Sequence, residues 1–248
     1  MAVNVTTSTT YYIEIIQFRT CADLTRPPCA PGFQTRSGGG TGGTLDFHIS
    51  NDAKIDVNII AILKGSYDLP EGGSTRQAYS GVTNGPVRIA STNSTNVIAA
   101  ERVIYAPYGS SVSFSELMGL PASQLDTTYW LPWYNNVGLD TQLRIGNVSG
   151  STATVNVYIH GSLMAGSPFT LAAGQSTQVS YAGQNDGPVQ IVSDIPIVAA
   201  ERVIYAPYGS SVSFSELMGL PASLLNTTYW LPWYNNVGLD TQLRFGFP

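Results

Sequence analysis

Hydrophobic and polar residues alternate along most of this chain with the two-residue period of a β-strand. In residues 153–160, apolar side chains at every second position from Ala153 to Ile159 alternate with polar ones. Since neighbouring side chains of a strand point to opposite faces, the pattern predicts a strand with one buried face. Similar short runs recur between Gly-, Asn- and Ser-rich turns, at about eight strands per 100 residues. The chain is therefore expected to be all-β.

This spacing of antiparallel, turn-linked strands predicts two tandem immunoglobulin-like antiparallel β-sandwiches, with a jelly roll as the alternative. The longer apolar run VIAAERVIYA is expected to be a central strand. One short helix is expected in SELMGLPAS, with Ser115 as its cap and Gly119 and Pro121 at its end.

Residues 99–144 and 199–244 are nearly the same sequence, offset by 100 positions. Two pairs differ across these 46 positions: Gln124 against Leu224 and Asp126 against Asn226. A period of this length predicts tandem domains rather than a solenoid of small repeats. A duplicated module more often spaces, binds or assembles than catalyses, because a catalytic site is usually a single constellation.

Weaker similarity divides the chain into strand pairs and the longer segments between them, which we call bodies. The three strand pairs are 9–18 with 44–51, 127–136 with 141–148, and 227–236 with 241–248. The first and second bodies are 53–123 and 153–223. From this division we expect three parts. Residues 1–43 are an amino-terminal strand with a Cys/Gly-rich insertion that packs on domain 1, residues 44–138 are the first sandwich, and residues 139–248 are the second with a terminal strand pair.

Three strand pairs and two bodies leave one pair surplus. If each body uses the pair that follows it, the amino-terminal pair is spare; if each uses the pair that precedes it, residues 227–248 are spare. A boundary within VGLD would leave one orphan strand at each end. A spare strand either folds back on its own domain or completes a sandwich in a neighbouring subunit.

The half-unit at each end, and a sequence that stops within a repeat at Pro248, favour exchange between subunits as a hypothesis. Head-to-tail repetition of such a contact would give an open filament. The donor residues would be Thr241, Leu243, Phe245 and Phe247, which share one face of the last strand.

The composition limits which partners the protein could bind and in which cellular compartment it could work. Charged residues make up 11% of the chain, below the roughly 25% of typical soluble domains. The net charge is −5 with no Lys/Arg cluster, which argues against nucleic-acid binding. There is no 18-residue apolar stretch to span a membrane and no signal-peptide pattern at the start. Cys21 and Cys29 are expected to form a local disulfide in an oxidising, extracellular compartment, with two free thiols as the alternative.

Few residues suggest chemistry. His48 and His160 fit no metal-ligand spacing, and the nucleophile, phosphate-binding and dinucleotide-binding motifs are missing, so no enzyme, cofactor or resident metal is expected. Asn135, Asn136 and Asp140 of NNVGLD could offer oxygens to Ca²⁺, although a plain turn is favoured. Charges within the apolar strands must be paired. The residues expected in structural ion pairs are Glu101, Arg102, Arg144, Glu201, Arg202 and Arg244, with Arg144 and Arg244 as possible partners of the glutamates.

The most distinctive motif is YWLPWYNN. It supplies the aromatic residues Tyr129, Trp130, Trp133 and Tyr134, repeated as Tyr229, Trp230, Trp233 and Tyr234. In a strand, Tyr129, Leu131 and Trp133 would share one face, and Pro132 indicates an edge or a bulge. Three roles are open: packing between domains or subunits, ordinary core, or a platform that stacks on sugars.

The motifs AAERVIY, SFSELMGLP and TTYWLPWYNNVGLDTQLR resemble a tandem unit found in large surface or secreted proteins of filamentous bacteria. The resemblance covers residues 45–248 and implies an extracellular, β-rich repeat protein. It implies no catalytic residues.

These observations predict a non-enzymatic, extracellular structural repeat protein, in its sharper form a cell-surface filament or pilus-like subunit assembling head-to-tail with its own copies. A carbohydrate-binding or adhesin module that uses the Trp/Tyr platforms is the alternative. A filament subunit should lose assembly without residues 241–248. A glycan binder should stay monomeric and lose binding on Trp133→Ala and Trp233→Ala.

Overall fold

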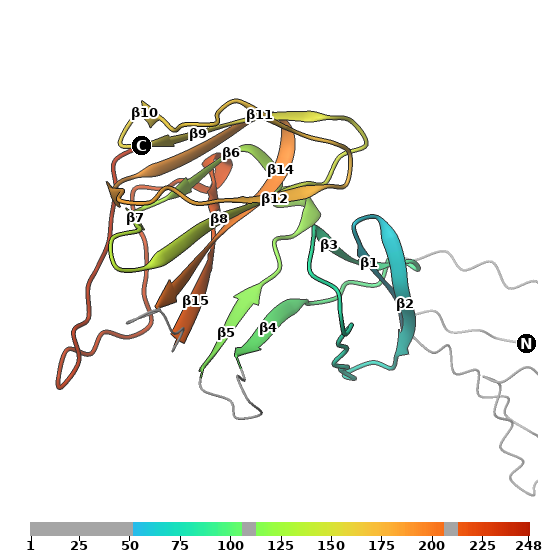
Figure 1. Ribbon diagram of the computed structural model, residues 1–248. Coiled ribbons are helices and arrows are strands. Elements are labelled where there is room, and N and C mark those ends of the chain that lie inside the picture. The colour runs from blue at the N-terminus through green and yellow to red at the C-terminus, as the bar shows by residue number, and fades with distance from the viewer. Residues whose placement is uncertain (1–51, 106–112, 206–212) are drawn as a thin grey trace, which may run out of the picture. The chain divides into compact units, whose positions relative to one another are not determined.

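A computed structural model describes residues 52–105, 113–205 and 213–248, and these residues are built from strands and two single-turn 3-10 helices (Figure 1). This confirms the all-β prediction. The chain divides into two units, Met1–Asn51 and Asp52–Pro248, and all described residues belong to the second. The predicted disulfide of Cys21 and Cys29, the first strand pair and the Cys/Gly-rich insertion lie outside the described residues. The described part has no helix with the length and apolar character needed to cross a membrane.

The second strand pair and the second body, which we together call the second repeat, form a β-sandwich; the first body is likewise the main part of the first repeat. Its strands are β6 (Asp126–Leu131), β7 (Tyr134–Asn135), β8 (Asp140–Asn147), β9 (Ala153–Ile159), β10 (Ser162–Leu163), β11 (Phe169–Leu171), β12 (Ser176–Val179), β13 (Asn185–Asp186), β14 (Val189–Tyr205), β15 (Ser213–Met218) and β16 (Leu220–Pro221). The alternation noted at 153–160 gives β9, whose odd-numbered residues are buried and whose even-numbered residues are half-buried. The predicted periodicity therefore places this strand correctly.

The 17-residue strand β14 lies in a nine-stranded sheet, whose two parts form the two layers of the sandwich and are what we call its two sheets. Its first half pairs with β6 and β9, and its second half pairs with β8 and β15. The register breaks between Val192 and Ile197, where Pro196 cannot donate a ladder hydrogen bond. The strand thus passes from one sheet into the other at this break (Figure 1).

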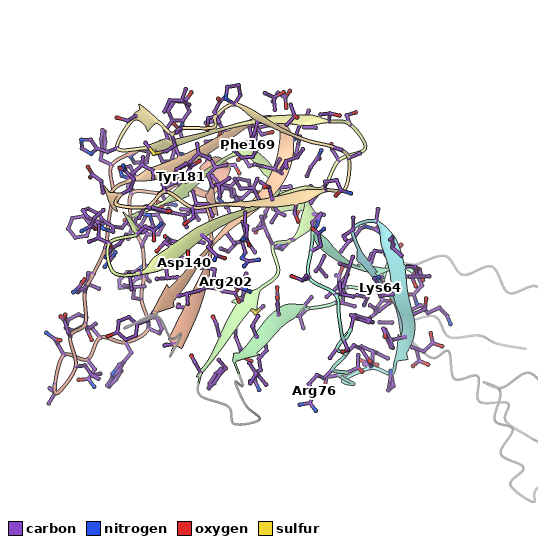
Figure 2. All side chains as sticks on the ribbon, viewed as in Figure 1. Lys64, Arg76, Asp140, Phe169, Tyr181 and Arg202 are labelled. Carbon is purple, nitrogen blue, oxygen red and sulfur yellow. The ribbon has the colours of Figure 1, made fainter. Side chains whose placement is uncertain are left out.

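The core lies between the two sheets. Phe169 and Tyr181 pack against it from the strands and loops at its side (Figure 2). Its largest fully buried side chains are Tyr129, Leu131, Tyr134, Leu143, Ile145, Ile159, Ile191 and Ile197. Five of these come from the second strand pair and three from the second body, so the pair supplies a large part of the core.

The pairing settles which strand pair the second body uses. Because β6 and β8 both hydrogen-bond to β14, residues 126–147 belong to the sandwich of the body that follows them. The expected division after residue 138 instead falls between β7 and β8, inside this sandwich. The second body therefore uses the pair that precedes it, and residues 227–248 belong to no strand of the described part.

The first repeat is less complete within the described residues. Its strands are β1 (Ala53–Ile59), β2 (Ile62–Leu69), β3 (Val87–Ser91), β4 (Ala100–Tyr105) and β5 (Ser113–Met118). β1 lies between β2 and β3 in one sheet, and β4 pairs with β5 in a separate hairpin. The described part therefore contains one sandwich, and the tandem immunoglobulin-like arrangement stays a prediction.

The prediction of a helix in SELMGLPAS is wrong. Residues 113–118 and 213–218 are strands, and in the described residues each is followed by a helical turn, η2 (Ala122–Gln124) or η4 (Ala222–Leu224). The run SFSELM also alternates with period two, and pairing with the preceding strand sets Glu116 directly opposite Arg102. Cross-strand charge pairing therefore prevails over the local capping signal.

Candidate functional site: the exposed third strand pair

Residues 227–248, which we call the tail, repeat the second strand pair in sequence, so the second pair shows what the tail is built to do. In the second pair, the buried Tyr129 hydroxyl donates to Ile197 O at 2.7 Å, and the buried Tyr134 hydroxyl donates to Thr141 O at 2.8 Å. Tyr134 also accepts a hydrogen bond from the Tyr181 backbone N–H at 2.7 Å. Both aromatic rings are thereby fixed between the pair and the second body.

The NNVGLD turn of the second pair is held by its own side chains. Asn136 Oδ1 accepts from the Thr141 N–H at 3.2 Å, Asn135 Oδ1 accepts from the Val137 N–H at 3.0 Å, and Asp140 Oδ2 accepts from Gln142 Nε2 at 2.8 Å. These oxygens serve the turn that was favoured over Ca²⁺ binding. The described ranges contain no group of three or more His, Cys, Asp or Glu side chains placed to hold a metal ion.

The tail keeps the same internal geometry. Tyr234 donates to Thr241 O at 3.2 Å, and Asn236 Oδ1 accepts from the Thr241 N–H at 2.7 Å. Asn235 Oδ1 accepts from the Val237 N–H at 2.9 Å, as its counterpart does in the second pair. The tail is therefore already folded into the turn that the second pair uses, although none of its residues belongs to a strand.

What distinguishes the tail is its exposure. Positions that are fully buried in the second pair are open to solvent in the tail. The exposed fractions are 0% for Tyr129 against 59% for Tyr229, 1% for Leu131 against 69% for Leu231, 0% for Leu143 against 57% for Leu243, and 1% for Ile145 against 88% for Phe245. Large apolar side chains that are exposed in such numbers are typical of interaction sites. The tail thus carries the apolar side chains that form one half of a sandwich core in the second pair, but here they are open to solvent.

The platform residues of YWLPWYNN accordingly have different surroundings. In the second pair, Tyr129 and Tyr134 are core residues, whereas Trp130 and Trp133 are half-buried at the surface. Trp133 therefore does not share the buried face of Tyr129, as a continuous strand would require, because β6 ends at Leu131 and Pro132 separates it from β7. In the tail, all four aromatic residues are exposed.

The tail packs lightly on the second body at a contact that the second pair also makes on the first body. A Cβ added to Gly246 would lie 3.0 Å from Pro188 Cβ, and one added to Gly146 would lie 2.9 Å from Pro86 Cβ. Both positions therefore require glycine for the close approach of strand pair and body. The same junction between a body and the next strand pair thus occurs twice along the chain.

A cavity of about 630 Å³ lies beside this contact. The arginine of the tail, Arg244, lies 5.9 Å from the centre of the Trp133 ring. The residues that line the cavity include Trp130, Trp133, His160, Gln190, Phe245 and Phe247. This cluster could not be predicted, because nothing in the chain order indicates that His160 and Gln190 lie beside the YWLPWYNN motif.

The ion pairs form with other partners than expected. Arg102 Nε donates to Glu116 Oε1 at 2.6 Å, and Arg202 Nε donates to Glu216 Oε1 at 2.8 Å. The first pair is half exposed, whereas Glu216 is buried to 5% side-chain exposure. Neither glutamate is among the residues expected in ion pairs, and their position directly opposite the arginines on the paired strands explains their role.

The second ion pair lies where strands of the two repeats meet. The Glu216 N–H donates to Ser115 Oγ at 2.9 Å, and the hydroxyls of Ser113 and Ser213 are 3.3 Å apart. Strands β5 and β15 therefore lie side by side, and equivalent serines of the two repeats meet. On strand β8, which pairs with β14, Arg144 donates through its Nη2 to Gln142 Oε1 of the same strand at 2.8 Å.

Glu201 carries the most perturbed carboxyl of the described chain. It is buried in β14, and burial raises the pKa of its carboxyl to about 7, an effect that the positive charge of Arg244 partly opposes. Burial disfavours the ionised carboxylate because water solvates it better than the protein does. The same position in the first repeat, Glu101, is exposed.

We expect this glutamate to make the second sandwich less stable as the pH rises from about 4.5 to about 7. In that window the unfolded chain has released the proton and the folded chain retains it, so raising the pH favours unfolding. The loss amounts to about 3 kcal/mol and stops above the folded-state pKa. Urea unfolding of Glu201→Gln across this range should lack the decline. Arg244→Ala should extend the decline to higher pH, and an unchanged profile in Glu201→Gln would assign it to another group.

Comparisons with protein-family models, with curated proteins and with solved structures found no match.

Proposed function

We propose that this protein is a non-enzymatic, extracellular structural repeat protein whose copies assemble head-to-tail by β-strand complementation, with the tail as donor. The observation that carries the proposal is the contrast in exposure between the second pair and the tail. Nearly identical sequences are core in one place and solvent-exposed in the other. An exposed strand pair with an apolar face is an aggregation liability unless a partner covers it.

Three features support assembly with a specific partner rather than non-specific aggregation. The tail holds the turn geometry of the second pair before any partner is present, which lowers the conformational entropy lost on docking. Its apolar residues match those that fill a body of the same repeat type. A heterologous contact of this kind does not close on itself, so it favours an open chain of copies. The low content of charged residues and the resemblance to bacterial surface repeats support an extracellular setting.

The test is the size of the purified full-length protein beside a version without residues 241–248. We expect the full chain to form high-mass species in size-exclusion chromatography and filaments in negative-stain electron microscopy. The truncated chain should remain monomeric and keep its circular dichroism spectrum, because the residues removed belong to no strand and all but the half-buried Thr241 are exposed. A full chain that stays monomeric at high concentration would rule out the proposal.

A matched control distinguishes docking from a change in solubility. Val137 is exposed even in the second pair, where the core is complete, so the equivalent Val237 should stay exposed in the assembly. Val237→Asp should therefore assemble normally, whereas Leu243→Asp should not, because its counterpart Leu143 is fully buried.

Glycan binding is the second candidate, and the cavity beside Trp130 and Trp133 favours it. A cavity of about 630 Å³ with two indole rings and the polar groups of His160 and Gln190 has the size and the chemistry of a sugar site. Retention of a monomeric chain on a glycan array, lost on Trp133→Ala, would support this function in place of assembly.

A further inference from the structure

The first body presents an open face at the positions that β6 and β8 cover in the second body. Val189, Ile191 and Ile197 of β14 are fully buried beneath the second pair. Their counterparts in the first body are Val87 at 51%, Ile89 at 40% and Val97 at 40% exposure. Within the described residues, the first body therefore lacks the strand pair that completes the second.

The register of the missing pair follows from the one that is present. On β14, Val189, Gln190 and Ile191 are opposite Leu131, Trp130 and Tyr129 of β6. Farther along, Ala199 and Glu201 are opposite Ile145 and Leu143 of β8. Shifting both partners to their repeat equivalents joins the first body to the tail. The resulting pairs are Val87 with Leu231, Arg88 with Trp230, Ile89 with Tyr229, Ala99 with Phe245, and Glu101 with Leu243.

Two substitutions in the tail indicate that its acceptor is the first body and not the second. Phe245 and Phe247 replace Ile145 and Asn147. In the second sandwich the buried Asn147 Nδ2 donates to the carbonyls of Ser151, Leu171 and Ala172, and phenylalanine cannot make these bonds. The position opposite Phe247 in the first body is the exposed Val97, and the next residue, Ile98, is 85% exposed. An aromatic side chain suits this apolar surface.

The tail is also a closer copy of the observed β14 partner than the chain's own first strand pair. Residues 227–236 are identical to 127–136, whereas 9–18 matches that segment at three of ten positions, Thr9, Thr10 and Tyr11. The outward-facing Trp130, which pairs with Gln190, is repeated as Trp230 in the tail and is Tyr12 in the first pair.

We infer that the acceptor for the tail is the open face of the first body of a second copy, formed by β3 and β4, in the register set by β6 and β8 on β14. This inference rests on the proposed assembly and specifies its partner surface. Each copy would then offer one tail and one acceptor, at opposite ends of its described sequence.

Disulfide trapping tests the register. Directly opposed residues of antiparallel strands have Cα atoms about 4.5–5.5 Å apart, which a disulfide can bridge. Arg88→Cys and Trp230→Cys, made in separate chains on a Cys21→Ser/Cys29→Ser background, should form an intermolecular disulfide on mixing and oxidation. Mass spectrometry of the linked peptides identifies the pair. Gln190→Cys with Trp130→Cys in one chain is the positive control, because the structure shows these residues opposite each other.

An off-register pair provides the matched negative control. Arg88→Cys with Thr228→Cys keeps both residues on the same face but displaces them by two positions, beyond the roughly 7 Å that a disulfide spans. This pair should lose the cross-link. Equal trapping of both pairs would indicate non-specific association and overturn the inference.

The remaining outcomes separate the inference from the proposed function. High-mass species without a link between residues 88 and 230 would overturn the acceptor and leave assembly standing. An intramolecular link between Tyr12→Cys and Arg88→Cys, with no link to residue 230, would show that the chain's own first pair covers the first body. A background protein that forms no high-mass species at all would count against the proposed assembly itself.

Discussion

Replacing Tyr134 by alanine is expected to lower the free energy of unfolding of the second sandwich by about 3–5 kcal/mol. The ring is fully buried, and its hydroxyl donates to Thr141 O and accepts from the Tyr181 N–H. Truncation would leave a cavity and remove the hydrogen bonds of the hydroxyl to the Thr141 carbonyl and the part-buried Tyr181 N–H, each of which adds to the loss. Urea unfolding followed by tryptophan fluorescence would measure the change.

The repeat supplies the control for this variant. Tyr234 has the same sequence neighbours but is exposed, so Tyr234→Ala should change stability by no more than about 0.5 kcal/mol in the monomer. It should weaken assembly instead, because the docked tail would bury this ring. Equal destabilisation by both variants would mean that the tail packs into a core of its own chain.

Glu216→Ala is expected to destabilise the second sandwich by about 3–5 kcal/mol, because it leaves the largely buried Arg202 guanidinium without its carboxylate. Arg202 binds Glu216 Oε1 through two nitrogens, and the Glu216 side chain is 5% exposed. Breaking one side of such a pair costs far more than the pair itself contributes, since the remaining charge has lost its solvent.

The equivalent pair in the first repeat again provides the comparison. Arg102 and Glu116 have the same cross-strand positions, but both side chains are 53% exposed. Glu116→Ala should therefore cost no more than about 1 kcal/mol, because water solvates the released arginine. Thermal unfolding of the two variants at low and high salt measures the difference. A large loss in Glu116→Ala would show that docking by another segment buries this hairpin.

The repeat and the strand periodicity could be predicted because both are local properties of the sequence. The alternation from Ala153 to Ile159 identified β9, and the turn residues of NNVGLD were placed correctly. SELMGL was assigned wrongly because Ser115 provides a helix cap only if no strand lies beside it. The pairing partner that decides this is residue 102, which local propensity does not consider.

The role of each strand pair could not be predicted, because it depends on pairing over long distances in sequence. The sequence allowed three ways to combine pairs and bodies, and the hydrogen bonds from β6 and β8 to β14 decide between them for the second body alone. Likewise, nothing in the identical stretches 127–136 and 227–236 indicates that one is buried and the other exposed. What distinguishes them in the structure is that the first pairs with β14, whereas the second pairs with no strand of the described residues.

The first and last strands of the second sandwich lie side by side. The exit strand β16 pairs with the entry strand β6, Pro221 opposite Tyr129, and the Ser223 N–H donates to Asp126 Oδ2 at 2.9 Å. A pulling force applied along the chain would therefore act mainly on the pairing of β16 with β6, and the rest of the sandwich would bear little of it. A series of such units under tension would extend in short steps, each one the separation of β16 from β6, while the buried β14 keeps each core intact.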